Sequence, residues 1–446
     1  MDERSSFEWV PSPLAIALGL TFFTAAMAWI AGSSIEEVAQ AWHGGLWNRP
    51  LIVFAFQAMF MLVLGHALAL SPLACRAIDC VVSWTGNTTS RAAATVALVA
   101  CSTAWLNWGL GLIVGAVLAR KVGERAARDG RRLNYGLIGA SGYTGLMVWH
   151  GGLSGSAPIK VAEPGHLADM ASLAGLNPAA MPSTIPLADT VFSAGNLGLT
   201  VLLIGAITAT AWWLGRRKPG DSTPLPEPLE LNAPAQKQSN LLARISPLAA
   251  VAGALVLALS VGEAVQHPDA LRLGFITPDW TNQVLLATAL LLHGKLARFL
   301  AATQEAIGGA TGILIQFPLY FGIMGLLTGT GLAHNISSAL IDIAGPNSFE
   351  WITMCSAGLV NIFVPSGGGQ WAVQGPVLIA AAAELGIPLK SAIMAMAYGD
   401  ELTNMLQPFW ALPLLGITGL QARDILPYTL VFMAVGAVIF STFLLG

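Results

Sequence analysis

Long apolar runs recur along the chain and are separated by short polar segments. A run of about 20 apolar residues is long enough to cross the hydrocarbon core of a bilayer as a helix. Such runs predict membrane spans at 13–31, 50–70, 134–158, 189–215, 246–263, 281–294, 309–328, 390–420 and 425–446. The pattern is typical of an all-α polytopic membrane protein.

Two further apolar stretches do not fit a single crossing. One lies at 92–119 with Asn-Trp-Gly in its middle, and the other lies at 351–386 with Pro-Ser-Gly-Gly-Gly in its middle. Each stretch is too long for one helix and too short for two full crossings, and each has helix-breaking residues at its centre. This pattern predicts a re-entrant hairpin, in which two half-helices meet at membrane depth.

The basic residues give these spans an orientation. The chain has 21 lysines and arginines, and a topology with the hairpin at 92–119 entering from the cytoplasm puts 21 − 4 = 17 of them inside. The four on the outer side are Arg49, Lys160, Arg272 and Lys390. Cytoplasmic loops carry such an excess of positive charge. We therefore expect a bacterial inner-membrane protein with a cytoplasmic N-terminus and a periplasmic C-terminus.

The order of spans and hairpins repeats along the chain. Each half has two spans, a hairpin, a span broken by polar residues (134–158 and 390–420) and a last span. One extra crossing between the halves turns the second upside down, so we expect two inverted-topology repeats. The units are a first repeat 1–215, a cytoplasmic linker 216–244, a linking span 246–263 and a second repeat 281–446.

Composition agrees with this interpretation and excludes other classes. Charged residues make up 10% of the 446 residues, whereas soluble domains average about 25%. The 21 basic and 24 acidic residues leave a net charge of −3, so we do not expect nucleic-acid binding. No two of the four cysteines have CxxC spacing, so neither a zinc site nor a disulfide framework is expected. We expect no resident cofactor.

Polar and helix-breaking residues lie at membrane depth in four places. Two are the hairpin tips, and two are the breaks at 151–158 and 399–408 in the spans that follow them. Asn107 precedes Ser154 by 47 residues and Asn361 precedes Gln407 by 46, so the halves match. A break leaves backbone groups that suit a bound carboxylate or Na⁺, although glycines there could instead only allow close helix packing.

Asp400 and Glu401 are adjacent acids inside a predicted span. An intramembrane acid is a functional candidate by default. We expect one of them, and Asp400 in particular because it lies beside Gly399, to hold a coupling cation. The same pair would be the exchange site of a cation/proton exchanger without an organic substrate, which is an alternative function. His150 abuts the first glycine break and is a further candidate.

Ser154 supports an alternative of another class. Gly152-Leu153-Ser154-Gly155 matches the GxSG sequence around the nucleophile of intramembrane serine hydrolases. A match of four residues has low specificity. The sequence contains no HExxH or Walker A motif. We therefore expect a protein that is not an enzyme.

Four longer segments closely resemble the bacterial short-chain fatty acid transporters, the acetoacetate/butyrate uptake family. They are LNWGLGLIVGA at 106–116, GGLSGSAP at 151–158, NIFVPSGGGQW at 361–371 and QPFWALP at 407–413. That family is similar, more distantly, to the ion transporter superfamily of divalent-anion/sodium symporters. The resemblance implies inverted repeats, re-entrant hairpins and a homodimer working by an elevator motion.

The resemblance implies a secondary transporter that couples a short-chain monocarboxylate, such as butyrate or acetoacetate, to Na⁺ or H⁺. The expected substrate-binding residues are Asn107, Trp108, Gly152, Ser154, Ser156, Asn361, Ser366, Gly367, Gly368, Gln370, Trp371, Gln407 and Phe409. Na⁺ is possible at the hairpin tips, and the expected cation-coupling residues are Asn107, Asn361, Asp400, Glu401, Thr403 and Asn404. The carboxylate would accept bonds from the serines, and the acyl chain would lie against Trp108, Trp371 or Phe409.

Overall fold

The structure is a computed structural model, and it describes residues 12–174, 176–220, 223–226, 240–267, 275, 277–341 and 343–446. The described residues form helices and connecting turns, and none of them belongs to a strand. The prediction of an all-α protein is therefore confirmed. Residues 1–11 and most of the linker predicted at 216–244 lie outside the described residues.

The first part of the chain ends with a long helix at Arg217. Its helices are α1 Pro13–Ile30, α2 Ile35–Leu46, α3 Arg49–Ala69, α4 Pro72–Trp84, α5 Thr89–Leu106, α6 Trp108–Arg128, α7 Tyr135–Tyr143, α8 Ser156–Lys160, α9 His166–Leu173 and α10 Ala194–Arg217. The span predicted at 134–158 is broken, because α7 continues only through the 3₁₀ turn η2 (Thr144–Met147) before the chain turns toward α8.

The second part has a similar order of elements. Its helices are α11 Asn240–Gln266, α12 Pro278–His293, α13 Leu296–Ile307, α14 Thr311–Gly329, α15 Leu332–Ile341, α16 Phe349–Phe363, α17 Gly367–Leu385, α18 Leu389–Thr403, α19 Pro408–Thr418 and α20 Ala422–Leu445. A 3₁₀ turn, η7 (Asn404–Leu406), separates α18 from α19. The order of helices from α14 to α20 thus matches that from α3 to α10, except that the short helix α9 has no counterpart. The inversion of one part relative to the other stays a prediction.

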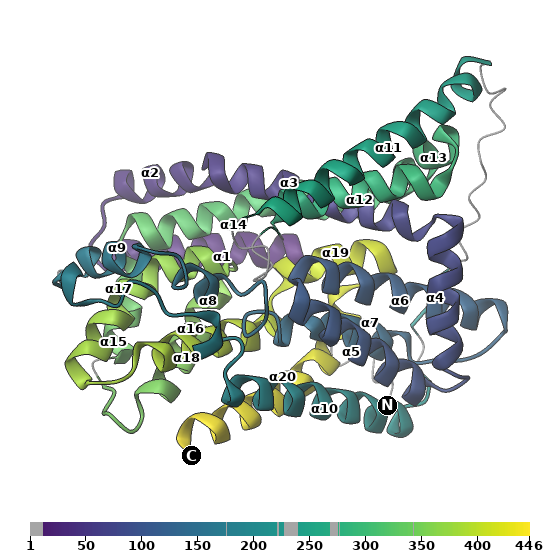
Figure 1. Ribbon diagram of the computed structural model, residues 1–446. Helices are drawn as coiled ribbons and strands as arrows, with labels where there is room; N and C mark the ends of the chain where they lie inside the picture. The colour runs from purple at the N-terminus through teal and green to yellow at the C-terminus, as the bar shows by residue number, and fades with distance from the viewer. Residues whose placement is uncertain are drawn as a thin grey trace.

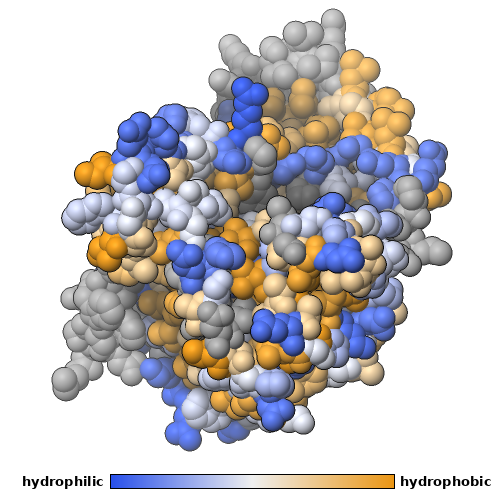
Figure 2. All heavy atoms as spheres, turned by 90° about the vertical axis from the view of Figure 1, so that its left-hand side faces the viewer, coloured by the Kyte–Doolittle hydropathy of each residue, from blue (hydrophilic) through white to orange (hydrophobic). Residues whose placement is uncertain are grey.

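Several helices are suited to a lipid environment. Within the described residues, the helices long and apolar enough to cross a membrane are Leu51–Ala69, Ala194–Arg217, Leu248–Gln266, Thr311–Gly329 and Ala422–Leu445. Large apolar side chains point outward from these and other helices, such as Phe22 (74% exposed) and Val201 (72% exposed). Figure 2 shows hydrophobic residues spread over one face between hydrophilic ones. An outer surface of this kind is expected to contact lipid.

The two predicted hairpins differ at their tips. Asn107 alone joins α5 to α6, and its Oδ1 accepts a hydrogen bond from the Leu110 N–H at 2.9 Å. The second tip is longer, because residues 364–366 separate α16 from α17. Pro365 has no N–H to continue α16, and the Ser366 Oγ caps α17 by accepting from the Gly369 N–H at 3.2 Å.

A layer of helices covers the second hairpin and includes one that the sequence analysis did not predict. This helix is α2, which packs along α14 (Figure 1). The two backbones touch, since a Cβ on Gly45 would lie 2.7 Å from the Gly325 Cα. Helices α11, α12 and α13 pack together on α3 and project away from the rest of the molecule (Figure 1).

Candidate functional site

The first break docks on the tip of the first hairpin. The Leu153 N–H donates to the Trp105 carbonyl at 2.8 Å, and the Trp108 N–H donates to the Ser154 Oγ at 2.9 Å. A Cβ on Gly152 would lie 3.0 Å from the Trp105 Cα, so a larger residue would push the break off the tip. Hairpin and break therefore supply each other's polar partners.

The second break docks on the second hairpin in a similar way, through Asn361 near the end of α16. The Asn361 Nδ2 lies 2.7 Å from the Asp400 carbonyl oxygen and 3.0 Å from both the Thr403 Oγ1 and the Asn404 Oδ1. The Gln407 Nε2 donates to the Asn361 carbonyl. An amide has only two N–H bonds for these three acceptors. Buried oxygens thus converge on one atom.

The two acids of α18 connect this break to the first one. The Glu401 Oε2 accepts hydrogen bonds from the N–H groups of His150 at 2.9 Å and Gly151 at 3.2 Å. The Asp400 Oδ2 lies 3.3 Å from the His150 Nδ1, and both side chains are fully or almost fully buried. The Ala157 N–H donates to the His150 Nε2 at 3.2 Å, which assigns the proton of a neutral ring to Nδ1, facing Asp400. Glu401 therefore supplies the acceptor that the broken backbone lacks.

The start of α17 lies against this buried group. A Cβ on Gly367 would lie 2.8 Å from the His150 Cε1 and from the Trp149 ring, and 3.3 Å from the Asp400 Oδ2. Gly368 lies close to Ser156. Glycine is thus required where the tip meets the first break. In the first turn of α17, the Gly369 N–H donates to the Ser366 Oγ and the Gln370 N–H donates to the Ser366 carbonyl.

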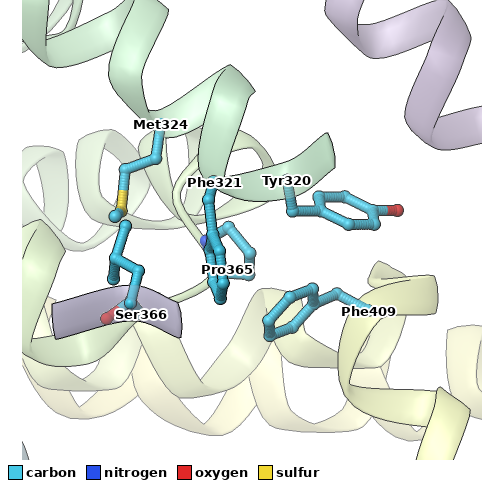
Figure 3. Close-up of a pocket in the computed structure, with 7 residues that line it drawn as sticks. Tyr320, Phe321, Met324, Pro365, Ser366 and Phe409 are labelled. Atoms are coloured by element: carbon cyan, nitrogen blue, oxygen red, sulfur yellow. The ribbon is translucent and has the colours of Figure 1, made fainter. Parts of the chain in front are cut away.

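A cavity opens on the other side of the same tip (Figure 3). It is narrow, with room for about one water molecule, and it is lined by Leu51, Tyr320, Phe321, Met324, Pro365, Ser366 and Phe409. Apart from the Ser366 hydroxyl, the lining is apolar or aromatic, and the Tyr320 hydroxyl points away from Ser366 in Figure 3. Its polar end and apolar walls match the two ends of a small amphipathic molecule, which would have to widen the cavity in order to enter.

A row of aromatic rings connects the two tips. Trp108, at the first tip, lies 4.9 Å from Trp410 between ring centroids, and Trp410 lies 5.0 Å from Phe409 in the cavity. Phe409 also stacks on Phe317 at 3.9 Å. Aromatic rings therefore link the first tip to the cavity wall.

The structure gathers some of the expected substrate residues and separates others. Ser366 and Phe409 line the cavity, whereas Gly367 lies against His150 and Trp149, and Gly368 lies close to Ser156. The others face elsewhere. Asn107, Trp108, Gly152 and Ser154 hold the first tip, Asn361 and Gln407 hold the second break, Gln370 donates to the Ala357 carbonyl, and Trp371 donates to the His166 Nε2.

The cavity residues on α14 were not among those expected. They are Tyr320, Phe321 and Met324, and together with Phe317, which stacks on Phe409, they have spacings of three, one and three residues, which places them on one face of a helix. This aromatic stripe, next to Pro318, was a usable signal. It was overlooked because α14 has the composition of an ordinary membrane span.

The geometry around Ser154 does not favour a hydrolase. Its Oγ accepts a hydrogen bond from the Trp108 N–H, whereas a serine nucleophile needs a histidine base within reach. The His150 ring is already engaged by Ala157 and Asp400, and the His293 ring contacts the Ala67 carbonyl.

Comparisons with known proteins agree with the resemblance of the motifs. The sequence profile of the family described as short chain fatty acid transporter matches residues 3–445. Two relatives with the provisional name of short-chain fatty acid transporter were found in Escherichia coli K12 (35% identical) and Haemophilus influenzae (33% identical). Each alignment covers 97% of this chain and 95% of the relative.

A solved structure of the YdaH transporter from Alcanivorax borkumensis aligns with a TM-score of 0.43 and 14% identity, covering 97% of this chain and 98% of that one. Because the family profile spans nearly the whole chain, the protein is a multi-pass membrane transporter, not an enzyme, and belongs to the short-chain fatty acid transporter family.

Proposed function

We propose that the protein is a cation-coupled symporter that carries a short-chain monocarboxylate, such as butyrate or acetoacetate, across the bacterial inner membrane. Membership of the family supports a transporter of short-chain fatty acids. The observation that carries the finer proposal is the cavity at the second tip, whose only polar lining besides the Tyr320 hydroxyl is Ser366 at the start of α17.

The substrate carboxylate would bind at the start of α17. The first N–H groups of a helix have no partner within the helix, and the helix dipole favours an anion there. Ser366 would add its hydroxyl, and Ser156, at the start of α8, lies close to Gly368 of the tip. The acyl chain would extend into the cavity toward Phe409. The cavity lining contains no basic residue, which supports a substrate with one carboxylate rather than two.

The coupling cation would bind beside Asn361. The Asn361 Oδ1 is buried and has no hydrogen-bond partner within the described residues. Rotation of the amide would exchange Oδ1 with Nδ2 and place four oxygens together: Asn361 Oδ1, the Asp400 carbonyl, Thr403 Oγ1 and Asn404 Oδ1. Such a group suits Na⁺, which unwound backbone carbonyls coordinate in other transporters. The Asp400 and Glu401 carboxylates would position the break instead of binding the ion.

Transport assays on the purified protein in proteoliposomes test this proposal. Labelled butyrate should accumulate when an inward Na⁺ gradient is imposed, and collapse of that gradient by an ionophore should stop accumulation. Accumulation driven only by a pH gradient would assign the coupling to H⁺. Exchange of Na⁺ for H⁺ without fatty acid movement would favour the exchanger, and no uptake under either gradient would overturn the proposal.

We also propose a homodimer with a cytoplasmic N-terminus and a periplasmic C-terminus. The distribution of basic residues supports the orientation. Asp129 follows α6 and Asp169 lies in the short helix α9, and both are exposed and lie on opposite predicted sides. A cysteine at position 129 should react with an impermeant reagent only from the cytoplasm, and one at position 169 only from outside. Labelling from the same side would contradict the topology, and chemical cross-linking in membranes would test the dimer.

A further inference from the structure

The cavity at the second tip has walls from two different layers of the molecule. Met324, Phe321 and Tyr320 come from α14, and Leu51 comes from α3. Pro365 and Ser366 come from the tip, and Phe409 comes from the first turn of α19. Helix α14 contributes to both ends of the cavity, with Met324 near Ser366 and Tyr320 near Phe409.

The polar end is close to Met324. A Cβ on Gly369 would lie 3.2 Å from the Met324 sulfur and equally far from the Ser366 Oγ. The thioether therefore lies beside the start of α17, where the carboxylate would bind. Methionine is flexible and fills irregular space, so its side chain sets how much room remains next to the carboxylate.

The far end is rigid. Phe409 stacks on Phe317 with an angle of 16° between the rings, and it meets Tyr320 edge-on with centroids 5.0 Å apart. Trp410 contacts the same ring edge-on. A ring held on three sides cannot turn aside for a longer ligand without disturbing its neighbours.

Phe321 stands between these two ends. Figure 3 shows its ring pointing into the cavity, with Ser366 and Met324 on one side and Tyr320 and Phe409 on the other. The side chain is only 4% exposed. Its backbone is fixed too, because the Phe321 carbonyl oxygen lies where a Cβ on Gly45 would be. An acyl chain that starts at Ser366 meets this ring before it reaches Phe409.

We propose that Phe321, assisted by Met324, determines the longest acyl chain that the protein carries. The inference rests on the proposed function, since it requires the substrate to bind at Ser366. Up to the ring, each methylene that enters the apolar cavity should raise affinity about fourfold. A methylene beyond that length must displace a buried ring in a packed environment, so affinity should fall.

A competition assay with fatty acids of increasing chain length tests the proposal. Unlabelled acids from acetate to octanoate would compete with labelled butyrate for uptake into proteoliposomes. Phe321→Ala should move the best competitor to a longer acid and raise the potency of hexanoate relative to butyrate by about tenfold, since two more methylenes gain room. Met324→Phe should move the best competitor to a shorter acid. Leu314→Ala, at an exposed position of α14, is the matched control and should leave the relative potencies of the competing acids unchanged.

The outcomes separate the inference from the proposed function. If the wild-type protein takes up no short-chain acid, the proposed function fails. If the wild-type protein and the variants transport butyrate and show the same relative potencies of the competing acids, the proposed function stands and the role of Phe321 is excluded. If Phe321→Ala does not insert in the membrane, Met324→Ala tests the same proposal. It removes a half-buried side chain from the same cavity and should also favour longer acids.

Discussion

The two hairpin tips resemble each other in layout but differ in how they are closed. A single residue, Asn107, turns the chain at the first tip, and the backbone N–H of Trp108 is satisfied by Ser154 of the adjacent break. The second tip takes three residues to turn and leaves Ser366 facing a cavity. A matched pair of elements can thus be divided between a closed tip that holds the structure and a tip that borders a cavity.

Replacement of Ser366 in the second tip and of Ser154 beside the first tip should give the largest difference in butyrate uptake. Ser366→Ala removes a hydrogen bond to a charged substrate, worth about 1.5–3 kcal/mol, and should raise the KM for butyrate about 10- to 100-fold. Ser154→Ala removes one hydrogen bond within the protein and should leave the KM unchanged. Initial rates of uptake over a range of butyrate concentrations measure both. Equal changes in the two variants would mean that both tips bind substrate.

Addition of one methyl group to a glycine at each tip should give the next largest contrast. A Cβ on Gly367 meets two stacked rings, His150 and Trp149, which cannot easily move. Overpacking costs about 1–3 kcal/mol, so Gly367→Ala should reduce uptake by about tenfold or more.

The counterpart at the first tip is Gly109→Ala. Its Cβ meets the end of the flexible Met61 side chain, so uptake should stay near the wild-type level when it is normalised to protein in the membrane. A loss of activity as large as that of Gly367→Ala would show that the first tip is equally constrained.

The threonines at the two breaks should differ more modestly. Thr403→Val removes one of the oxygens near Asn361 and should raise the Na⁺ concentration for half-maximal uptake by about fivefold, the worth of one neutral hydrogen bond. The Thr144 hydroxyl donates to the Ser141 carbonyl within its own span, so Thr144→Val should not alter the Na⁺ dependence. An unchanged Na⁺ dependence in Thr403→Val would place the cation elsewhere.

The smallest effect concerns a contact that braces the second hairpin from outside the predicted spans. The Trp371 Nε1–H donates to the His166 Nε2 at 2.8 Å, which requires an unprotonated Nε2. Burial, aided by Lys160, holds the His166 pKa below its usual value, although Glu163 and Asp169 oppose the shift. The contact is therefore fully present above the usual pKa of about 6.5 and is lost as the pH falls through the lowered value.

Thermal unfolding of the wild-type protein and Trp371→Phe between about pH 5 and pH 8 measures this effect, since the range spans the usual histidine pKa. Trp371→Phe should melt at a lower temperature than wild type at the upper end of the range, and the difference should disappear toward the lower end. A difference that does not depend on pH would exclude His166 as the titrating partner.

Much of this arrangement could be predicted because it depends on local chemistry. Apolar runs of sufficient length indicate the long helices, and the breakers at Asn107 and Pro365 indicate the tips. The pairing of Glu401 with the backbone of His150 could not be predicted, because the two are 251 residues apart and their contact depends on how the halves pack. Hydropathy likewise gives no sign of which face of α14 borders a cavity, so Phe321 was overlooked. The short helix α2 was missed, although Ser34 and Glu37 form a capping box at its start.

The contact between Gly45 and α14 links the ligand cavity to a position that does not line it. Any side chain at residue 45 would push against the Phe321 carbonyl and the Gly325 backbone, and would shift the ring that divides the cavity. If Phe321 limits the acyl chain as proposed, the range of acids carried could change during evolution through a substitution in α2, with every lining residue conserved. A classification of homologues by their cavity residues alone would then group together transporters with different substrate ranges.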